Sequence, residues 1–304
     1  MKTRSLIYLF IYAVMLAMGH ILQKMVLNHG VDRLVFAFLR IASGFFIITT
    51  LLIAKTKTGN PVIKGKVDFL ARLIKKNIRH FIVLGIGFSG LGILLKLWGL
   101  SLTTATNASF IMSLSSVAVV LFAFIFLKEK AHNRFYAVVV MMIGGVYLVT
   151  TGGKQLLPQT GDLIIFFLAF LIGSMQVYGK QVLRSISVLE TSFGRSMVGM
   201  IFLGLLIPIF APEGFSTIPS FPVLLLVLSN GITFSGSIVL FYKALQNEGA
   251  SNTGMFALLV PVLTTVFGYF LLNERLNVYQ VIGGMVILLG SFMISRIKIK
   301  QANF

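Results

Sequence analysis

The sequence predicts an all-α integral membrane protein with ten transmembrane helices, arranged as two inverted five-helix repeats. Three observations lead to this prediction: an apolar composition, ten apolar stretches of membrane-spanning length, and an internal repeat. Of the 304 residues, 57% are hydrophobic and only 11% are charged, whereas an ordinary soluble domain has roughly 25% charged residues. Because a helix needs roughly 20 apolar residues to cross a bilayer, the length suffices for ten spans, and a water-soluble fold is excluded.

Ten apolar stretches follow one another along the chain. We expect helices, because every backbone N–H and C=O group inside the hydrocarbon must be paired within its own segment. Lys2 and Arg4 precede the first stretch as in a secretory signal, but its length of about twenty residues indicates a first span. The expected spans are residues 5–27, 31–54, 81–100, 105–127, 134–151, 162–183, 188–210, 222–242, 251–272 and 279–296.

The distribution of Lys and Arg predicts that both termini face the cytoplasm, in a cell inner membrane. Segments on the side of the N-terminus carry 19 of the 26 basic residues, eight of them between Lys55 and Arg79, and segments on the other side carry four. Cytoplasmic loops of membrane proteins are enriched in this way. The net charge of +18 therefore indicates topology and attraction to anionic lipid, and no nucleic-acid partner is expected.

The residue inventory argues against chemistry at a metal or a cofactor. There is no cysteine, which excludes disulfides, thiolate metal sites and cysteine nucleophiles. The four histidines and eight acidic residues are scattered, whereas an enzyme site needs such groups clustered. The pattern G-x-x-x-x-G-K-[ST] of ATP-hydrolysing proteins is also absent. We therefore expect no metal, no cofactor and no enzymatic activity.

An internal repeat relates the two halves of the chain. Five spans in each copy is an odd number, so the copies must enter the membrane in opposite orientations, as in many secondary transporters. We expect residues 1–151 to form the first five-helix repeat, 152–161 a connecting loop, and 162–304 the second repeat. A shift of 145 residues pairs Ala105 with Ala250, Asn107 with Asn252, Leu114 with Leu259, Phe122 with Phe267, Glu129 with Glu274 and Gly145 with Gly290.

Short motifs occur in the same order in both halves. In the second half these are Tyr242-Lys243-Ala244-Leu245, Gly249-Ala250-Ser251, Leu259-Val260-Pro261-Val262, Leu272-Asn273-Glu274-Arg275-Leu276, Gly283-Gly284 and Leu289-Gly290. In the first half they are Leu97-Trp98-Gly99-Leu100, Thr106-Asn107-Ala108-Ser109, Leu127-Lys128-Glu129-Lys130 and Gly144-Gly145. With these motifs the sequence resembles the EamA-type branch of the drug/metabolite transporter (DMT) superfamily over nearly its whole length.

The resemblance implies ten helices around a central cavity and transport of a small metabolite such as an amino acid or a nucleobase. It identifies no substrate and brings no catalytic or coupling motif. Two positions depart from the pattern, because Ser116 stands opposite Pro261 and Ala17 opposite Gly173. We therefore expect helix bending to differ between the halves.

Three basic residues lie inside expected spans, where a charge is costly and usually faces the protein interior. Arg40 and Arg195 occupy equivalent places in spans two and seven, and their guanidinium groups suit a carboxylate or phosphate on a substrate. Lys96, near the end of span three, is a further substrate-binding candidate. The alternative for all three is pairing with helix carbonyls or reaching to a membrane interface.

His20 is the candidate for proton coupling, because histidine titrates near neutral pH and this one lies well inside a span. A hydrogen-bonded packing histidine is the alternative. None of the eight acidic residues lies deep in a span, so a carboxylate proton relay is not expected. Coupling would then depend on His20 or on substrate exchange.

Polar and aromatic side chains in the spans are candidates for binding a small hydrogen-bonding solute. Close helix packing is the alternative for the polar residues, and interfacial anchoring is the alternative for the aromatic ones. The candidates are Trp98 on span three, Asn107 and Ser113 on span four, Gln176 and Tyr178 on span six, Asn230 and Tyr242 on span eight, and Asn252 on span nine.

One motif suggests a different function. Residues 85–90 read G-I-G-F-S-G and match the dinucleotide-binding pattern G-x-G-x-x-G, which requires a preceding strand and a βαβ unit. This copy opens an apolar span, so we interpret it as close packing or bending of span three.

The function predicted from these features is secondary transport of a small polar metabolite, such as an amino acid or a related anion, by alternating access. The protein would be an exporter or an exchanger. A membrane-embedded enzyme acting on lipid or prenyl substrates, or a non-transporting membrane scaffold, is the alternative. The expected partners are a small-molecule substrate and membrane lipid, with the chain as a monomer or homodimer.

Overall fold

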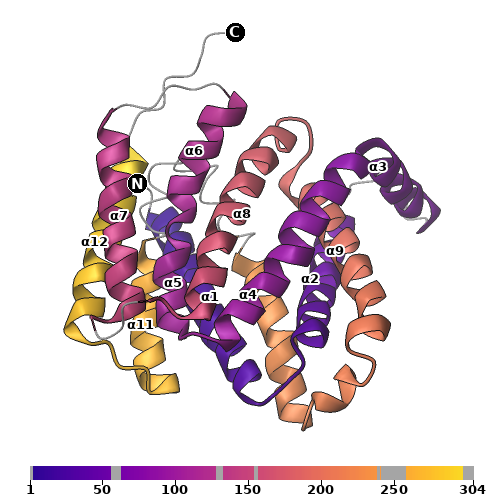
Figure 1. Ribbon diagram of the computed structural model, residues 1–304. Coiled ribbons are helices and arrows are strands. Elements are labelled where there is room, and N and C mark those ends of the chain that lie inside the picture. The colour runs from indigo at the N-terminus through magenta and orange to yellow at the C-terminus, as the bar shows by residue number, and fades with distance from the viewer. Residues whose placement is uncertain are drawn as a thin grey trace.

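The computed structural model describes residues 3–55, 63–127, 133–153, 157–237, 240 and 258–296, and its regular elements in these ranges are all helical (Figure 1). Six helices are long and apolar enough to cross a membrane, and four shorter apolar helices accompany them. The all-α fold with ten apolar helices is thus confirmed.

The first half runs from α1 to α7. Its elements are α1 (Thr3–Asn28), α2 (Arg33–Lys55), α3 (Ile63–Leu84), the π-helix η1 (Gly85–Leu91), α4 (Gly92–Ser101), α5 (Ala105–Met112), α6 (Ser115–Leu127) and α7 (Asn133–Thr151). The second half comprises α8 (Thr160–Val182), α9 (Val188–Phe210), the 3-10 turn η2 (Gly214–Thr217), the helix Phe221–Ser237, α11 (Leu259–Leu272) and α12 (Val278–Arg296).

Successive spans run in opposite directions, which gives the bundle two faces. The near face is the one at which α1 begins, and the far face is the one at which α1 ends, near the turn of residues 28–33. In Figure 1 the near face is at the top and the far face at the bottom. α8 therefore ends, and α9 begins, at the near face.

Equivalent helices of the two halves pack against one another. α2 contacts α9 and α7 contacts α12, and these pairs are the second and fifth helix of each half. α1, the first helix of the first half, contacts α11, the fourth of the second half. In the same way α8, the first helix of the second half, contacts α6, which belongs to the fourth span of the first half. These swapped contacts are the packing expected of an inverted repeat.

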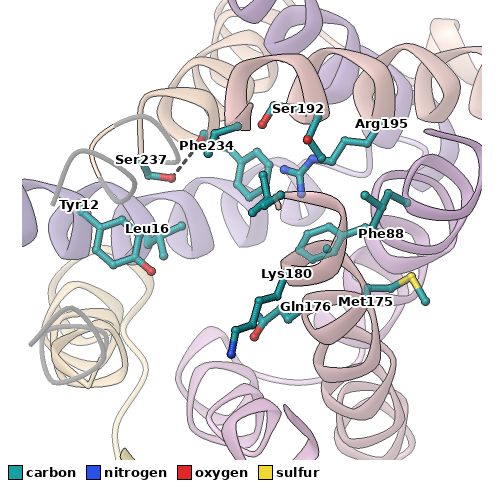
Figure 2. Close-up of a pocket in the computed structure, with 15 residues that line it drawn as sticks. Tyr12, Leu16, Phe88, Met175, Gln176, Lys180, Ser192, Arg195, Phe234 and Ser237 are labelled. Carbon is teal, nitrogen blue, oxygen red and sulfur yellow. Dashed lines mark hydrogen bonds between the residues drawn. The ribbon is translucent and has the colours of Figure 1, made fainter. Parts of the chain in front are cut away.

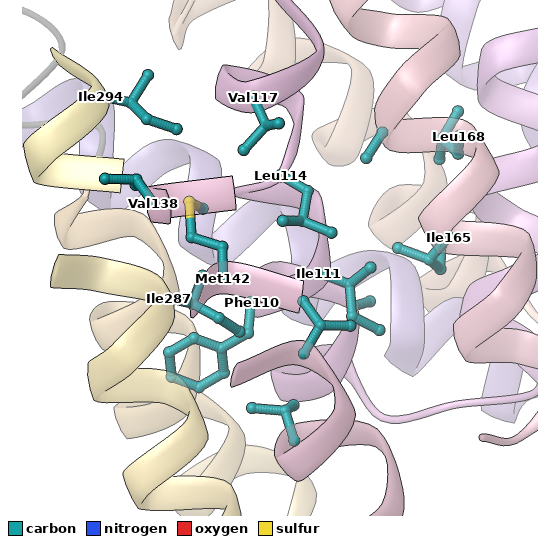
Figure 3. Close-up of a cluster of buried hydrophobic side chains, with 14 of the residues drawn as sticks. Phe110, Ile111, Leu114, Val117, Val138, Met142, Ile165, Leu168, Ile287 and Ile294 are labelled. Atoms are coloured by element: carbon teal, nitrogen blue, oxygen red, sulfur yellow. The ribbon is translucent and has the colours of Figure 1, made fainter. Parts of the chain in front are cut away.

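The largest buried apolar cluster lies where α5, α6, α7, α8 and α12 meet (Figure 3). Phe110 and Ile111 of α5, Met142 of α7, Ile165 of α8 and Ile287 of α12 interdigitate there. The cluster joins the two halves on one side of the bundle, and smaller buried apolar clusters pack α2, α3 and α9 on the other side.

Span three is longer than the sequence indicated. Residues 55–79 were expected to be an inner loop, but α3 starts at Ile63 and continues through η1 and α4 as one helical rod. The reason is a stripe of apolar residues at helical spacing, in which Leu73 is buried and Phe69 and Ile74 pack around it. Arg72, Lys75, Lys76 and Arg79 of α3 are exposed.

Span four is broken where one continuous helix was expected. α5 ends at Met112 and α6 begins at Ser115. At the break, Ser116 Oγ donates to the Ser113 carbonyl oxygen (2.8 Å) and Ser113 Oγ donates to the Ser109 carbonyl oxygen (3.4 Å). Serine hydroxyls that bond back to carbonyls in this way favour helix bending.

Candidate functional site

A cavity of about 410 Å³ lies between the two halves on the side of the near face (Figure 2). Its walls come from the first half through α1, α3 and η1 and from the second half through α8, α9 and the helix Phe221–Ser237. Gln176 and Lys180 line it and are exposed, so the cavity is open to solvent. A second hollow, of about 460 Å³, lies along α11 beside the exposed Tyr269 and Phe270 and faces the outside of the bundle.

The lining combines aromatic rings with a few polar groups. The aromatic side chains are Tyr12, Phe88 and Phe234, and the polar ones are Gln176, Lys180, Thr191, Ser192, Arg195 and Ser237. Two of these are basic, and none of the described residues that line the cavity is acidic. A volume of this order suits a small molecule, and a mainly apolar wall with a few polar groups is typical of a ligand site.

Arg195 lies on α9 and is positioned by the close packing of α9 against α3 and η1. A capping box formed by Ser187 and Glu190 starts α9 at the near face, and Arg195 follows two turns later. Gly85 and Gly194 allow α9 to approach η1 and α3, because a Cβ on Gly85 would lie 3.1 Å from the Arg195 carbonyl oxygen and one on Gly194 would overlap the Phe81 ring. The interpretation of residues 85–90 as a close-packing segment is confirmed.

Arg195 stacks on an aromatic ring in the cavity. Its guanidinium carbon lies 4.6 Å from the centroid of the Phe88 ring and 6.0 Å from that of Phe234. Figure 2 shows the three side chains together at one side of the cavity. The first stacking distance is in the range of an effective cation–π interaction.

Arg40 is also close to Phe234 and is only 4% exposed. Its guanidinium carbon is 4.2 Å from the centroid of the Phe234 ring, and its Nε donates to Asn230 Oδ1 at 2.6 Å. Asn230 is itself held, because its Nδ2 donates to the Gly19 carbonyl oxygen (2.8 Å) and Gln23 Nε2 donates to its Oδ1 (3.4 Å). Arg40 is therefore a buried, hydrogen-bonded group beyond the wall of the cavity.

The two phenylalanines belong to a repeated motif that the shift of 145 residues does not reveal. Residues 85–90 read G-I-G-F-S-G and residues 231–236 read G-I-T-F-S-G, at a shift of 146. The first half therefore has one extra residue between Gly90 and Ala105. The π-helix η1 starts with this motif, and a π-turn takes one more residue than an α-turn. A comparison of the halves that allowed one insertion would have found Phe88 and Phe234.

The remaining candidates of the first half lie apart from the cavity lining. His20 on α1 and Lys96 on α4 are half-buried and interact electrostatically with Arg40. Trp98 is 52% exposed, as an interfacial anchor would be. Asn107 accepts a hydrogen bond from Gln280 Nε2 (3.1 Å) at the far face, and Ser113 is the C-cap residue that follows α5.

Among the candidates of the second half, Gln176 and Arg195 line the cavity. Tyr178 instead bonds His80 Nδ1 through its hydroxyl (2.8 Å). Tyr242 and Asn252 lie outside the described residues. Within the described ranges, no three His, Cys, Asp or Glu side chains gather as a metal site would require.

The far face is closed by hydrogen bonds between elements. Lys24 Nζ donates to the carbonyl oxygens of Leu100 (2.8 Å) and Thr103 (2.6 Å), which ties α1 to the end of α4. Thr103 also donates to the Asp162 carboxylate at the start of α8. Glu274, just after α11, accepts from the backbone N–H groups of Ala105 and Thr106. The cavity thus opens at the near face, while hydrogen bonds join elements of the two halves at the far face.

Comparison with known proteins identifies related sequences. A model of the EamA-like transporter family matches residues 3–151 and 159–296. A transporter of Methanothermobacter thermautotrophicus is 28% identical over 209 residues, which are 66% of this chain and 60% of that protein. The uncharacterized transporter YyaM of Bacillus subtilis is 30% identical over 231 residues, which are 71% and 73% of the two chains.

Two further similarities concern a named substrate and the fold. The riboflavin transporter ImpX of Fusobacterium nucleatum is 24% identical over 246 residues, which are 77% of this chain and 82% of that protein. A crystal structure with 14% sequence identity superimposes with a TM-score of 0.60 and covers 93% of this chain and 97% of the other. At this identity the likeness shows a shared fold.

Proposed function

Because the chain belongs to the EamA-like transporter family, within the DMT superfamily, we propose that this multi-pass membrane protein is a secondary transporter working by alternating access. Its cargo is a small polar metabolite, such as an amino acid or a related anion, and it acts as an exporter or exchanger. The observation that carries the proposal is a solvent-open cavity between the two halves at one face, opposite a far face closed by hydrogen bonds.

In this proposal the near face is cytoplasmic and the conformation is open to the cytoplasm. The enrichment of Lys and Arg in segments on the side of the N-terminus supports this orientation. The inverted repeat supports the second conformation, because exchanging the roles of the two halves closes the near face and opens the far one. His20, within electrostatic range of Arg40 and Lys96, is the candidate for proton coupling.

The cavity lining supports an anionic cargo. Lys180 and Arg195 contribute positive charge, and no described lining residue offsets it with a carboxylate. A guanidinium binds carboxylates and phosphates through two parallel N–H donors. A flat aromatic solute is a second candidate class, which Tyr12, Phe88 and Phe234 favour and with which the similarity to a riboflavin transporter agrees.

Transport by reconstituted protein tests the proposal. The purified full-length chain is inserted into liposomes loaded with a panel of amino acids, organic acids, phosphorylated metabolites and riboflavin, and efflux and counterflow are measured. We expect protein-dependent flux of at least one member, with counterflow if the protein exchanges solutes. Protein-free liposomes are the control. Absence of flux across the whole panel, with folded protein shown to be inserted, contradicts the proposal.

A further inference from the structure

The inverted repeat builds two arginine–phenylalanine pairs whose members are exchanged between the halves. Arg40 of the first half stacks on Phe234 of the second, and Arg195 of the second half stacks on Phe88 of the first. The two rings hold the same position in the G-I-x-F-S-G motif, and the arginines hold the same position in α2 and α9. The pairs are therefore equivalent by the symmetry of the fold.

One position makes the two pairs chemically unequal. Asn230 lies one turn before Phe234 and accepts the hydrogen bond from Arg40 Nε. At the shift of 146 residues that aligns the motifs, its equivalent before Phe88 is Leu84. Leu84 lines the cavity, and its hydrocarbon side chain accepts no hydrogen bond. The position that holds the Asn230 amide in the second half is therefore occupied by an apolar side chain in the first half. Arg195 lines the cavity, whereas Arg40 does not.

We propose that Arg195 binds the anionic group of the substrate and that Arg40, hydrogen-bonded to Asn230, has a structural role. Resting on the proposed transport function, this defines the substrate class as a small carboxylate or phosphate that carries a flat unsaturated ring.

The geometry supports both parts of this substrate class. Stacking on Phe88 uses the face of the Arg195 guanidinium, whereas a carboxylate or phosphate engages the N–H groups at its edge. Tyr12 and Phe234 supply further aromatic surface in the same cavity, against which a flat ring packs well. Lys180, exposed at the opening, attracts anions into the cavity.

Binding to the purified full-length chain in lipid nanodiscs tests the proposal. The probes are benzoate and phenyl phosphate, compared with the neutral benzamide and with cyclohexanecarboxylate, which keeps the charge but lacks the flat ring. We expect at least one of the two anions with a flat ring to bind at least about tenfold more tightly than either comparison compound. The tenfold figure is the scale of one charge-assisted interaction.

Four variants separate the roles of the two arginines. Arg195→Gln should weaken binding of the anionic probe by about tenfold or more with little change in melting temperature, and Arg195→Lys should restore part of it. Leu84→Asn, which introduces an amide like that of Asn230 at the equivalent position of the first half, should also weaken binding.

Arg40→Gln should lower the melting temperature and leave the affinity within about twofold. If this variant does not fold, Asn230→Leu, which leaves Arg40 intact, replaces it with the same expectation.

Two results would overturn the assignment: unchanged affinity in Arg195→Gln, or an equal loss of affinity in Arg40→Gln at an unchanged melting temperature. A protein that transports other solutes from the liposome panel but binds neither anionic probe refutes the substrate class and leaves the transport function standing. A protein that moves no solute at all refutes the transport function itself.

Discussion

Glu274 is one of the residues through which the second half is bonded to the first half at the far face. Its Oε1 accepts from the Ala105 N–H at 2.7 Å and its Oε2 from the Thr106 N–H at 2.9 Å. These are first-turn donors of α5, which have no partner within their own helix. The carboxylate also lies at the positive end of the helix dipole, so charge and hydrogen bonding act together.

Replacing Glu274 by Gln should destabilise the closed far face. The amide keeps one acceptor but turns an N–H₂ group toward a backbone donor and removes the negative charge, at a cost of about 1–2 kcal/mol. The expected result is a lower melting temperature and faster labelling of a single cysteine introduced at Thr106. Glu190→Gln, which weakens the capping box at the near face, is the control and should leave that labelling rate unchanged. Equal labelling in Glu274→Gln and the parent would contradict the role assigned to Glu274.

The sequence was informative about charged residues and less so about their partners. Arg40 and Arg195 stand out because charges are rare in spans, and their equivalence follows from the repeat. The structure shows that Arg195 lines the cavity and that Arg40 donates to Asn230. Neither contact can be read from the sequence alone. Phe88 and Phe234 do not stand out among 28 phenylalanines, because their motifs align at a shift of 146 residues and the other matches at 145.

At the scale of elements, the contact between α7 and α12 depends on paired glycines. A Cβ on Gly145 would lie 2.9 Å from the Gly283 carbonyl oxygen and 3.0 Å from Ile287 Cγ1. Helices can approach this closely only where small residues meet. The adjacent Gly144 faces open space, because a methyl group added there would meet no atom within 4 Å.

Replacing Gly145 by Val should therefore separate α7 from α12 and lower the free energy of unfolding by about 1–3 kcal/mol, the usual cost of overpacking. Gly144→Ala is the matched control and should be neutral or slightly stabilising, because alanine favours a helix. Thermal or denaturant unfolding of both variants in the same detergent measures the difference. Similar stabilities of the two variants would show that the close approach contributes nothing.

The positions of the spans could be predicted, because hydropathy alone marks a membrane helix. The break between α5 and α6, the π-helix η1 and the extension of α3 toward the near face could not. Each arises from local hydrogen bonding or from packing against a neighbour: Ser113 and Ser116 at the break, α9 against η1, and Leu73 under α3.

At the scale of the whole molecule, the two halves form one transport unit. Their swapped helix contacts enclose several buried apolar clusters and a cavity of about 410 Å³. The internal repeat predicted this arrangement, since five crossings per copy require opposite insertion. It did not predict at which face the cavity opens, because the two conformations of an inverted repeat are nearly equivalent by symmetry.

A single cysteine at Ser192, which lines the cavity, measures access from each face without interference, since the chain has no cysteine of its own. Ser192→Cys protein in oriented liposomes is treated with a membrane-impermeant thiol reagent on one side at a time. We expect reaction from the near face in the absence of solute and, once a transported solute is supplied at the far face, additional reaction from the far side. Reaction from one face alone whatever solute is present, or from neither face, would contradict alternating access through this cavity.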